Sequence, residues 1–289
     1  MTKPRLSVVI PTWNRAHILC EAIDSALNQH GGEVEVIVVD DCSTDGTLAL
    51  VKRTFGSRVQ VLQMATRGGQ GNARNAGALL ASGEFVGFLD SDDVWLPGKL
   101  DAELRVFAEY PAAIAVISDS QTFFEGRRDA DSRFAQNGLL AATQGRVRLV
   151  DDCDWMWTNS TIIAHMTGIT VRRAALAQLG PRLFAEDLSV CEDWEFQMRL
   201  YSLGPVAVLP EVYCWIRRFD DNSRLGRSIP GQAPNREQEI ALLRARLKVM
   251  ERSETWLHNL RADLAAELER FRTVTEERLS QLTDKVMTA

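Results

Sequence analysis

The sequence predicts an α/β protein with a Rossmann-like, mostly parallel sheet flanked by helices and a helical extension at the C-terminus. Short apolar runs alternate with amphipathic segments up to about residue 110, the pattern of right-handed βαβ units. Polar segments follow three of these runs, at the strand ends where such sheets collect ligands. After Pro234 the chain contains neither Gly nor Pro, which is typical of long helices.

Strands and helices are expected in alternation through the N-terminal third. Residues 6–10 are an apolar run ended by Pro11, as expected of a strand buried on both faces. Residues 16–29 repeat apolar side chains at helical spacing. The same criteria predict further strands over 34–39, 59–64 and 84–89, and helices over 47–55 and 71–81.

The alternation weakens in the middle of the chain. The expected elements there are a strand over 113–118, helices over 169–179 and 192–203, and a strand over 206–209. Residues 123–143 are polar and predict loops, and residues 219–234 collect Asp, Asn, Ser, Gly and Pro, which predicts a loop or hinge. We therefore expect one domain over residues 1–225 and a helical extension over residues 226–289.

Composition limits the classes of function. The 289 residues are 45% hydrophobic, enough for a sizeable core without disulfide or metal staples. A net charge of −6 argues against a nucleic-acid partner, whose phosphates need a basic face. No apolar run approaches the ~18 residues of a transmembrane helix, and residues 6–10 are too short for a signal-peptide core. Five Cys without a CxxC pair exclude a disulfide scaffold, so the cytoplasm is the expected compartment.

The C-terminal extension predicts a homo-oligomer. Apolar residues recur mostly three or four positions apart from Ile240 to Phe271, and the remaining positions mix Arg and Glu. As one rod the extension would run roughly 80 Å at about 1.5 Å per residue, so its apolar stripe needs a partner. A two-chain coiled coil or helical dimer is the preferred interpretation. A hairpin that bends near Ser253 and folds back onto the preceding domain is the alternative.

The acidic tetrapeptide Asp90-Ser91-Asp92-Asp93 follows the strand predicted over 84–89. Carboxylates this close repel one another unless a cation joins them. Their hard oxygen atoms suit Mn²⁺ or Mg²⁺, and few protein ligands leave coordination sites for substrate phosphates. An exposed acidic turn is the competing interpretation. An EF-hand is excluded because the twelfth position counted from Asp41 is Lys52 and not Glu.

Two other acidic segments allow both a structural and a functional interpretation. Residues 40–46 end a predicted strand, where a carboxylate could accept from a base N–H or a ribose hydroxyl, or cap the next helix. Residues 192–195 open a predicted helix, where acids complement the helix dipole or present a general base. The glycine-rich residues 68–71 match no phosphate-binding spacing and predict a turn that lets Arg74 approach a ligand.

Five segments follow one another in a specific order: VVIPTWNR (8–15), VVDDCSTDGT (38–47), ARNAG (73–77), FLDSDD (88–93) and EDW (192–194). Together they resemble family 2 glycosyltransferases of the GT-A fold. An ordered set of motifs is far more specific than any one of them. The resemblance covers about residues 5–220 and excludes the C-terminal helices.

The resemblance implies a donor pocket for a nucleotide sugar. It implies that Pro11 and Thr12 line the pocket and that Asp41 hydrogen-bonds a pyrimidine base. It also implies that Arg74 contacts the nucleotide or its diphosphate. Finally, it implies that Asp90 and Ser91 lie against the ribose and the diphosphate.

The resemblance further implies a metal ligand and a catalytic base. Asp92 corresponds to the last acid of the family's DxD motif and would bind Mn²⁺ or Mg²⁺, and Asp193 corresponds to the catalytic base. Either Arg217 or Arg218 would close over the diphosphate. The sequence departs from the family at Arg67, where Asn is common, which puts the contacts to the base or phosphate in doubt.

The implied activity is inverting transfer of a sugar from a UDP- or dTDP-sugar to an acceptor, most simply a hydroxyl group. Acceptor specificity is expected from residues 121–167, where Trp155 and Trp157 suit a sugar ring or pack in the core. His165 is expected to be a core residue. The acceptor could be a glycan, a lipid-linked sugar, a peptide or a small molecule.

Two other functions remain open. A nucleotidyltransferase would share the sheet and the metal-binding acids, but it normally has a basic, glycine-rich loop where this chain has residues 11–14. A non-catalytic transferase-like scaffold would not need the intact acids. Attachment to a membrane surface through the C-terminal helices is a further possibility, although their mixed charges favour protein contacts.

Overall fold

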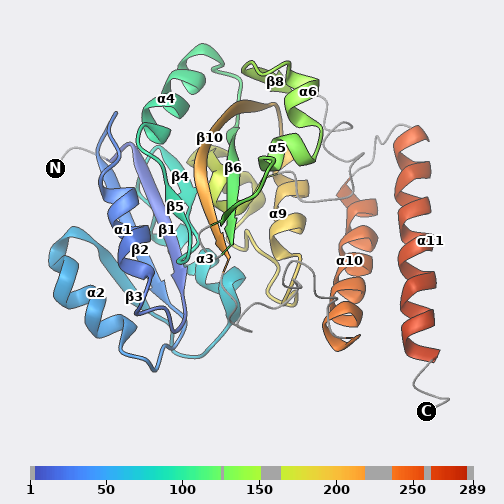
Figure 1. Ribbon diagram of the computed structural model, residues 1–289, viewed down its shortest axis with the longest axis horizontal. Helices are drawn as coiled ribbons and strands as arrows, with labels where there is room; N and C mark the ends of the chain where they lie inside the picture. Colours follow the sequence, from blue (N-terminus) through green and yellow to red (C-terminus); the bar gives the residue numbers. More distant parts are fainter. Residues whose placement is uncertain (1–3, 125–126, 151–163, 219–235, 257–261, 285–289) are drawn as a thin grey trace.

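A ten-stranded mixed sheet forms the centre of the molecule, with helices on both faces (Figure 1). The structure is a computed structural model that describes residues 4–124, 127–150, 164–218, 236–256 and 262–284. The strands are β1 (Leu6–Thr12), β2 (Val34–Asp40), β3 (Gln60–Gln63), β4 (Phe85–Phe88), β5 (Val94–Trp95), β6 (Ala115–Phe124), β7 (Arg127–Arg128), β8 (Arg148–Val150), β9 (Ile169–Arg172) and β10 (Val206–Arg218).

The strand order is β3-β2-β1-β4-β9-β6-β10-β5, with β7 paired to β6 and β8 paired to β10. The first four strands are parallel, as the alternating pattern predicts. Every residue of β1 is buried, because helices cover both faces of the sheet. The strand ends of β1, β2 and β4 therefore lie along one edge, and the three polar segments continue from them.

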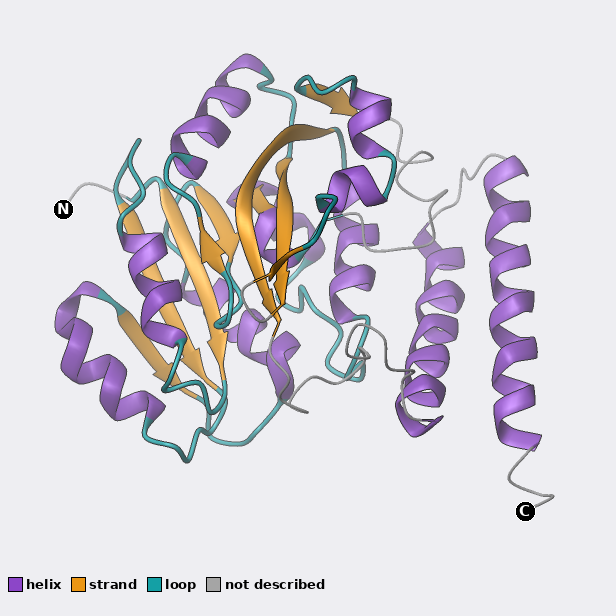
Figure 2. Ribbon diagram, viewed as in Figure 1, coloured by secondary structure: helices purple, strands orange, loops and turns teal. Residues whose placement is uncertain are grey.

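The helices divide between the two faces of the sheet (Figure 2). The core on one face contains residues of α1, α2 and α4, and the core on the other face contains residues of α3, α8 and α9. A Cβ at Gly77 would lie 2.4 Å from Val9, so only glycine lets α3 lie this close to β1. The helices are α1 (Leu19–Leu27), α2 (Thr47–Phe55), α3 (Gly69–Leu80), α4 (Lys99–Glu109), α5 (Arg133–Gln136), α6 (Leu139–Thr143), α8 (Arg173–Leu176), α9 (Glu192–Tyr201), α10 (Arg236–Trp256) and α11 (Ala262–Asp284), with short 3₁₀ turns at Gly56–Arg58, Met166–Gly168 and Ala177–Leu179.

The prediction of one helix over residues 169–179 is wrong for its first four residues. These form β9, which lies antiparallel between β4 and β6. Three of the four, Ile169, Thr170 and Val171, are β-branched and buried, which favours a central strand. Helical structure begins only at Arg173. This insertion turns the mostly parallel sheet into a mixed one.

Two other middle segments are more ordered than predicted. Strand β10 continues past residue 209 to Arg218, because the register irregularity between Leu209 and Val212 accommodates Pro210. Residues 123–143, predicted as loops, contain the end of β6 and the short helices α5 and α6. Helix α4 had no counterpart among the predicted elements. The longer β10 matters for function because it carries Arg217 and Arg218 back to the strand-end edge.

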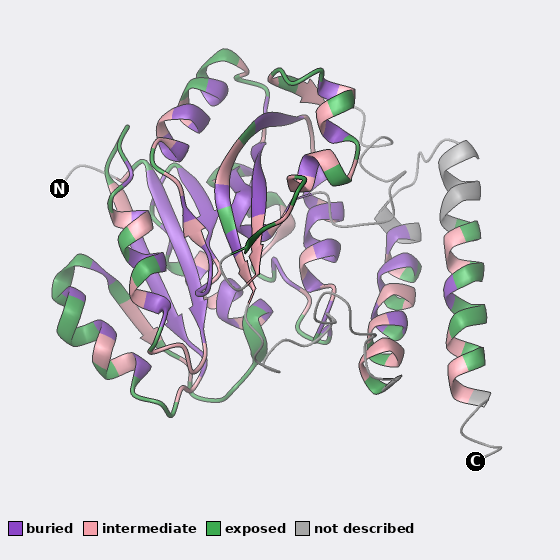
Figure 3. Ribbon diagram, in the orientation of Figure 1, coloured by how far each residue is buried: buried purple, intermediate pink, exposed green. Residues whose placement is uncertain are grey.

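The C-terminal extension is a helical hairpin and not one rod (Figure 3). Arg278 pairs with Glu239 and Phe271 lies by Arg246, so α11 runs antiparallel to α10. Helix α10 buries Val249 in the main core, beside α9. The apolar stripe thus packs against other segments of the same chain. The prediction of a single rod is therefore wrong, and the structure agrees with the alternative in which the extension folds back onto the preceding domain. The predicted domain boundary at residues 225–226 lies outside the described residues.

No helix in the described part of the chain combines the length and the apolar character needed to cross a bilayer.

Candidate active site

A cleft of about 900 Å³ opens where the strand-end loops meet the N-terminus of α9. One wall is formed by the segments that follow β1, β2 and β4, and we call it the strand-end wall. The other is formed by residues 188–194 together with Leu242 and Arg246 of α10, and we call it the helical wall. The cleft is therefore built partly by the C-terminal hairpin, which the sequence motifs did not indicate.

Eight of the ten residues that the resemblance assigns to the site line this cleft: Pro11, Thr12, Asp41, Asp90, Ser91, Asp92, Asp193 and Arg218. The two others contact its lining from behind. Arg74 is buried between Asp90 and Glu192, and Arg217 donates to the loop that carries Asp92. The structure thus brings together acids that lie about 100 residues apart in the sequence, Asp92 and Asp193 among them.

Asp41 is held by the glycine turn that precedes α3. Its two carboxylate oxygens accept from the backbone N–H groups of Gly68 and Gly69, at 2.7 and 2.8 Å. The guanidinium carbon of Arg67 lies 3.5 Å from the centre of the Trp13 ring, a close cation–π contact. Arg67 therefore stacks on an aromatic ring at the cleft, beside the residue expected to bind the base.

Thr12 adds an unsatisfied group to the same region. Its hydroxyl is buried and has no hydrogen-bond partner among the described residues. Buried hydroxyl groups normally have a partner, so this oxygen is available to a ligand in the cleft.

The acidic loop after β4 is fixed through Asp93, which is buried. One oxygen of Asp93 accepts from the Thr167 hydroxyl at 2.6 Å, and the other accepts from the backbone N–H of Arg217 at 3.1 Å. The Nε of Arg217 donates to the backbone carbonyl of Asp92 at 2.6 Å, and Thr167 accepts from the N–H of Asp90 at 3.3 Å. Asp93 thus ties the loop to two separate segments.

The residues of this loop fit a divalent cation that a substrate helps to bind. Asp92 lines the cleft, with Arg15 3.9 Å from one of its oxygens. Among the described residues no three His, Cys, Asp or Glu side chains form a ready-made metal cage. Mg²⁺ and Mn²⁺ sites of this kind combine one or two carboxylates with phosphate oxygens. The carboxylate oxygens of this loop are the kind of ligand that such a site requires.

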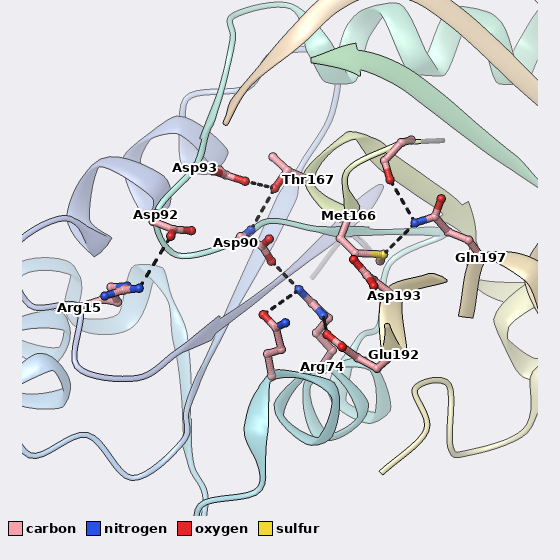
Figure 4. Close-up of polar contacts among 12 residues, drawn as sticks. Arg15, Arg74, Asp90, Asp92, Asp93, Met166, Thr167, Glu192, Asp193 and Gln197 are labelled. Atoms are coloured by element: carbon pink, nitrogen blue, oxygen red, sulfur yellow. Dashed lines mark hydrogen bonds and ion pairs between the residues drawn. The ribbon is translucent and has the colours of Figure 1, made fainter. Parts of the chain in front are cut away.

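Arg74 joins the two walls of the cleft (Figure 4). Its guanidinium lies 2.7 Å from Asp90 and 3.1 Å from Glu192, with only 1% of the residue exposed. Burial alone would lower the pKa of Arg74, but the carboxylates of Asp90 and Glu192 raise it above its usual value. The guanidinium is therefore a permanently charged strut between the acidic loop and α9.

The N-terminus of α9 presents two adjacent acids in different environments. Glu192 is 1% exposed, and burial together with the Asp193 charge raises its pKa to about 7 although Arg74 opposes this. Asp193 is half-buried and lines the cleft. Asp193 also accepts from the N–H of Trp194 at 2.8 Å, which orients its carboxylate. One acid is thus enclosed and the other is open to a substrate.

Left-handed backbone geometry is concentrated at this site. Four residues other than glycine have positive φ in the described parts of the chain; one of them lines the cleft and two are next in sequence to residues that line it. These are Asn14, Cys42 and Cys191, with φ of 52°, 65° and 65°. Such conformations cost about 1–3 kcal/mol each and cluster where function requires a fixed geometry. Cys191 directly precedes Glu192, so the strain sets the direction in which α9 presents its acids.

Two arginines complete the cleft near Asp193. Arg133, on α5, and Arg218 both line it. Burial and the neighbouring charge of Arg218 lower the pKa of Arg133, whereas Asp193 raises it. The three groups are therefore close in space. Of the two candidates from β10, Arg218 faces the cleft, while Arg217 pairs with Glu21 and with the acidic loop.

The predicted acceptor segment is only partly described. Trp155 and Trp157 lie outside the described residues. His165 lines the cleft, and its Nδ1 is 2.8 Å from the Ser120 hydroxyl. It is therefore not the plain core residue that the sequence predicts, although its hydrogen bond to Ser120 explains its orientation.

Sequence reasoning missed several residues that shape the site. Asp93 belongs to the acidic tetrapeptide 90–93 that the sequence analysis singled out. Its place after two other acids was the only sign that it has a role in the site. Arg133 lies in a segment predicted to be loops, and Arg246 lies in an extension for which a two-chain coiled coil was the preferred interpretation. Thr167 carried no signal, because its role depends on contacts across the sheet.

Comparisons with known proteins place the chain in a family. The family model described as glycosyl transferase family 2 matches residues 7–176, more than half of the chain. The protein ExoO of succinoglycan biosynthesis in Rhizobium meliloti is 40% identical over 43% of this chain and 36% of its own length. The poly(ribitol-phosphate) β-N-acetylglucosaminyltransferase TarS of Staphylococcus aureus is 31% identical over 72% of this chain and 34% of its own. These matches span about a third of each relative.

Solved structures share the fold. Residues 1–349 of S. aureus TarS, crystallised with UDP, match with a TM-score of 0.63 and 22% identity over 99% of this chain and 72% of that one. A mannosyltransferase from Pyrobaculum calidifontis, in complex with GDP-Man and Mn²⁺, matches with a TM-score of 0.61 and 18% identity over 100% and 76% of the two chains. The GT-A type fold expected from the resemblance is thereby confirmed. With motifs, fold and family model in agreement, the chain belongs to glycosyl transferase family 2.

Proposed function

We propose that this protein transfers a sugar from a nucleotide-diphosphate donor, UDP- or dTDP-linked, to a hydroxyl group of an acceptor. The observation that carries the proposal is the position of Asp92 and Asp193. One lies on the strand-end wall and the other on the helical wall of a single cleft (Figure 4). A metal-binding acid facing a second, open acid is what displacement of a diphosphate by a hydroxyl requires.

The donor would lie along the strand-end wall. Pro11 and Thr12 line that wall, and the free Thr12 hydroxyl could accept from or donate to the nucleoside. Asp41 would accept a hydrogen bond from an N–H of the nucleobase. Its carboxylate oxygens have lone pairs left over after they accept from the backbone N–H groups of Gly68 and Gly69. Asp90 and Ser91 would border the ribose and diphosphate.

The diphosphate would be neutralised by cations from both sides. Asp92 would hold Mn²⁺ or Mg²⁺, and such an ion supplies Lewis-acid stabilisation of the charge that grows on the leaving oxygen. Arg218 would approach the diphosphate from β10, while Arg217 keeps the acidic loop in place. Arg74 is enclosed by Asp90 and Glu192, so we assign it to positioning both walls.

Asp193 would act as the general base. Its carboxylate would take the proton of the acceptor hydroxyl as that oxygen attacks the anomeric carbon from the face opposite the diphosphate. The bond to the acceptor oxygen forms as the bond to the diphosphate oxygen breaks, so one displacement inverts the anomeric centre. Glu192 is enclosed and its pKa is raised to about 7 by burial, so the acid that can meet the acceptor hydroxyl is Asp193.

Relatives support a nucleotide-sugar donor. Structures of S. aureus TarS were solved with UDP and with UDP-GlcNAc, and the P. calidifontis enzyme with GDP-Man and Mn²⁺. UDP-GlcNAc is accordingly the first donor to test here. We propose a catalytic domain over residues 1–225, whose cleft the hairpin completes with Leu242 and Arg246. We also propose a cytoplasmic site of action and self-association through the hairpin. Binding to a membrane surface is a secondary possibility.

Slow donor hydrolysis tests the proposal without knowledge of the acceptor. The protein is incubated with UDP-GlcNAc and Mn²⁺, and release of UDP and GlcNAc is followed by chromatography. We expect slow release that EDTA abolishes. A parallel incubation with UTP and GlcNAc-1-phosphate tests for a nucleotidyltransferase, and product there would contradict the proposal. No reaction in either arm, together with Mn²⁺-independent UDP binding, would indicate a non-catalytic scaffold.

A further inference from the structure

The C-terminal hairpin places a cationic side chain, Arg246, in the wall of the cleft that carries the proposed general base Asp193. Arg246 and Leu242 of α10 line the same cleft as Asp193. Both Arg246 and Asp193 act on the Cys191 thiol, whose pKa burial raises to about 12, with Asp193 raising it further and Arg246 lowering it. The charges of both side chains reach the same thiol, and both side chains line the same cleft.

Arg246 is held in place by an aromatic pair. Its guanidinium carbon lies 5.8 Å from the centre of the Phe271 ring, and that ring meets Trp194 edge to face at 6.4 Å. Trp194 follows the proposed base directly. Stacking on a ring orients a guanidinium while its N–H donors stay available for a ligand.

Arg246 takes part in no salt bridge within the residues that the structure describes. The nearby acid Asp187 is already paired with Arg252 at 2.5 Å and Lys248 at 3.7 Å. Of the other arginines that line the cleft, Arg15 lies 3.9 Å from Asp92, whereas Arg67 stacks on the Trp13 ring. A half-buried guanidinium without a salt bridge favours an anionic ligand, and its planar fork fits phosphate and carboxylate.

The position of Arg246 indicates the acceptor and not the donor. The donor diphosphate belongs at the strand-end wall, with Asp92 and Arg218. Helix α10 lies on the other side of α9 from the sheet, as Figure 1 shows. An acceptor that attacks opposite the leaving diphosphate must reach Asp193 from this helical wall.

We propose that Arg246 binds an anionic group of the acceptor, so that this enzyme glycosylates acceptors carrying a phosphate or a carboxylate near the reacting hydroxyl. The inference rests on the proposed function, and it adds the chemical class of the second substrate. It also gives the C-terminal hairpin a role in the site, because without α10 the helical wall has no such cation.

Binding of matched charged and neutral probes tests this. Isothermal titration with Mn²⁺ and UDP present compares ribitol 5-phosphate with ribitol, and glucuronate with glucose. The two pairs distinguish a phosphate from a carboxylate ligand. We expect the wild type to bind at least one charged probe about tenfold more tightly than its neutral counterpart, as one charge-assisted contact allows. R246Q should remove that preference. R244Q changes an exposed arginine of the same helix and should retain it.

Three results would overturn the proposal. The wild type could show no preference for either charged probe. The preference could persist in R246Q. The affinity for UDP with Mn²⁺ could fall in R246Q as much as the affinity for the anion, which would assign Arg246 to the donor. Failure of the wild type to bind UDP with Mn²⁺ would instead contradict the proposed function, and the charged pairs can still be compared without UDP.

Discussion

The two walls of the cleft are held together by different forces. In the strand-end wall, short polar contacts join the loops, such as those of Asp93 to Thr167 and Arg217. In the helical wall, α9, α10 and α11 meet through aromatic and aliphatic packing around Trp194 and Phe271. The wall that gathers the acids is thus held by directional bonds, whereas the wall that carries Asp193 and Arg246 is held mainly by packing.

The walls also depend on each other through one residue. Arg74 is bonded to Asp90 on one side and to Glu192 on the other. The variants below either cut this connection or weaken one wall alone, and they are ordered by expected effect.

Replacing Arg74 should have the largest effect. Arg74→Met leaves two carboxylates without their cation, and breaking a buried ion pair in this way costs about 3 kcal/mol or more. We expect the urea midpoint to fall accordingly and UDP-GlcNAc hydrolysis to disappear. Arg105→Met, at an exposed ion pair with Asp101, is the matched control and should change stability by about 0.5 kcal/mol at most. Equal stability of the two variants would contradict the role of Arg74 as a strut.

Asp93→Asn should weaken the strand-end wall alone. The amide keeps one acceptor oxygen and loses the other, so either Thr167 or the N–H of Arg217 loses its partner. Groups that orient metal-binding side chains typically change metal affinity by about 10–100-fold. Titration of Mn²⁺ in the presence of UDP should show this loss. A change no larger than that of Asp101→Asn, at an exposed acid of α4, would remove Asp93 from this role.

Glu192→Gln should alter how stability depends on pH. An acid whose pKa is about 7 when folded and 4.5 when unfolded keeps its proton longer in the folded protein. Its effect on stability is therefore nil below about pH 4.5, grows more unfavourable as pH rises to about 7, and is constant above. Urea unfolding at pH 5 and pH 7 should show a smaller loss of stability in the variant than in the wild type. An identical loss in both would contradict the raised pKa.

Phe271→Ala should affect the helical wall only slightly. The variant loses the edge-to-face contact with Trp194 and the ring beneath Arg246, which we expect to cost about 1–2 kcal/mol. UDP-GlcNAc hydrolysis should stay at the wild-type rate, because the donor lies on the other wall. Val274→Ala, 57% exposed on the same helix, should leave the unfolding midpoint unchanged. Loss of hydrolysis in Phe271→Ala would show that the two walls are not independent.

The sequence predicted the strand-end wall better than the helical wall for a physical reason. The position of Asp41 or Asp90 follows from the local rule that buried parallel strands deliver their C-terminal ends to one edge. The contacts of Arg246 and Thr167 follow from packing between distant segments, which no local pattern encodes. Strand β9 was mistaken for a helix because its four residues precede a truly helical segment. The apolar stripe of α10 was recognised, but its packing against α9 and α11 of the same chain was only the alternative to a two-chain coiled coil.

One measurement tests most directly whether the strand-end wall binds the donor while the helical wall supplies the general base. Asp193→Asn is titrated with UDP and Mn²⁺ and assayed for UDP-GlcNAc turnover on the same preparation. The account predicts wild-type UDP affinity together with turnover reduced by about 10²–10⁴-fold, because only general-base catalysis is removed. Undiminished turnover, or a loss of UDP affinity as large as the loss of turnover, would contradict it.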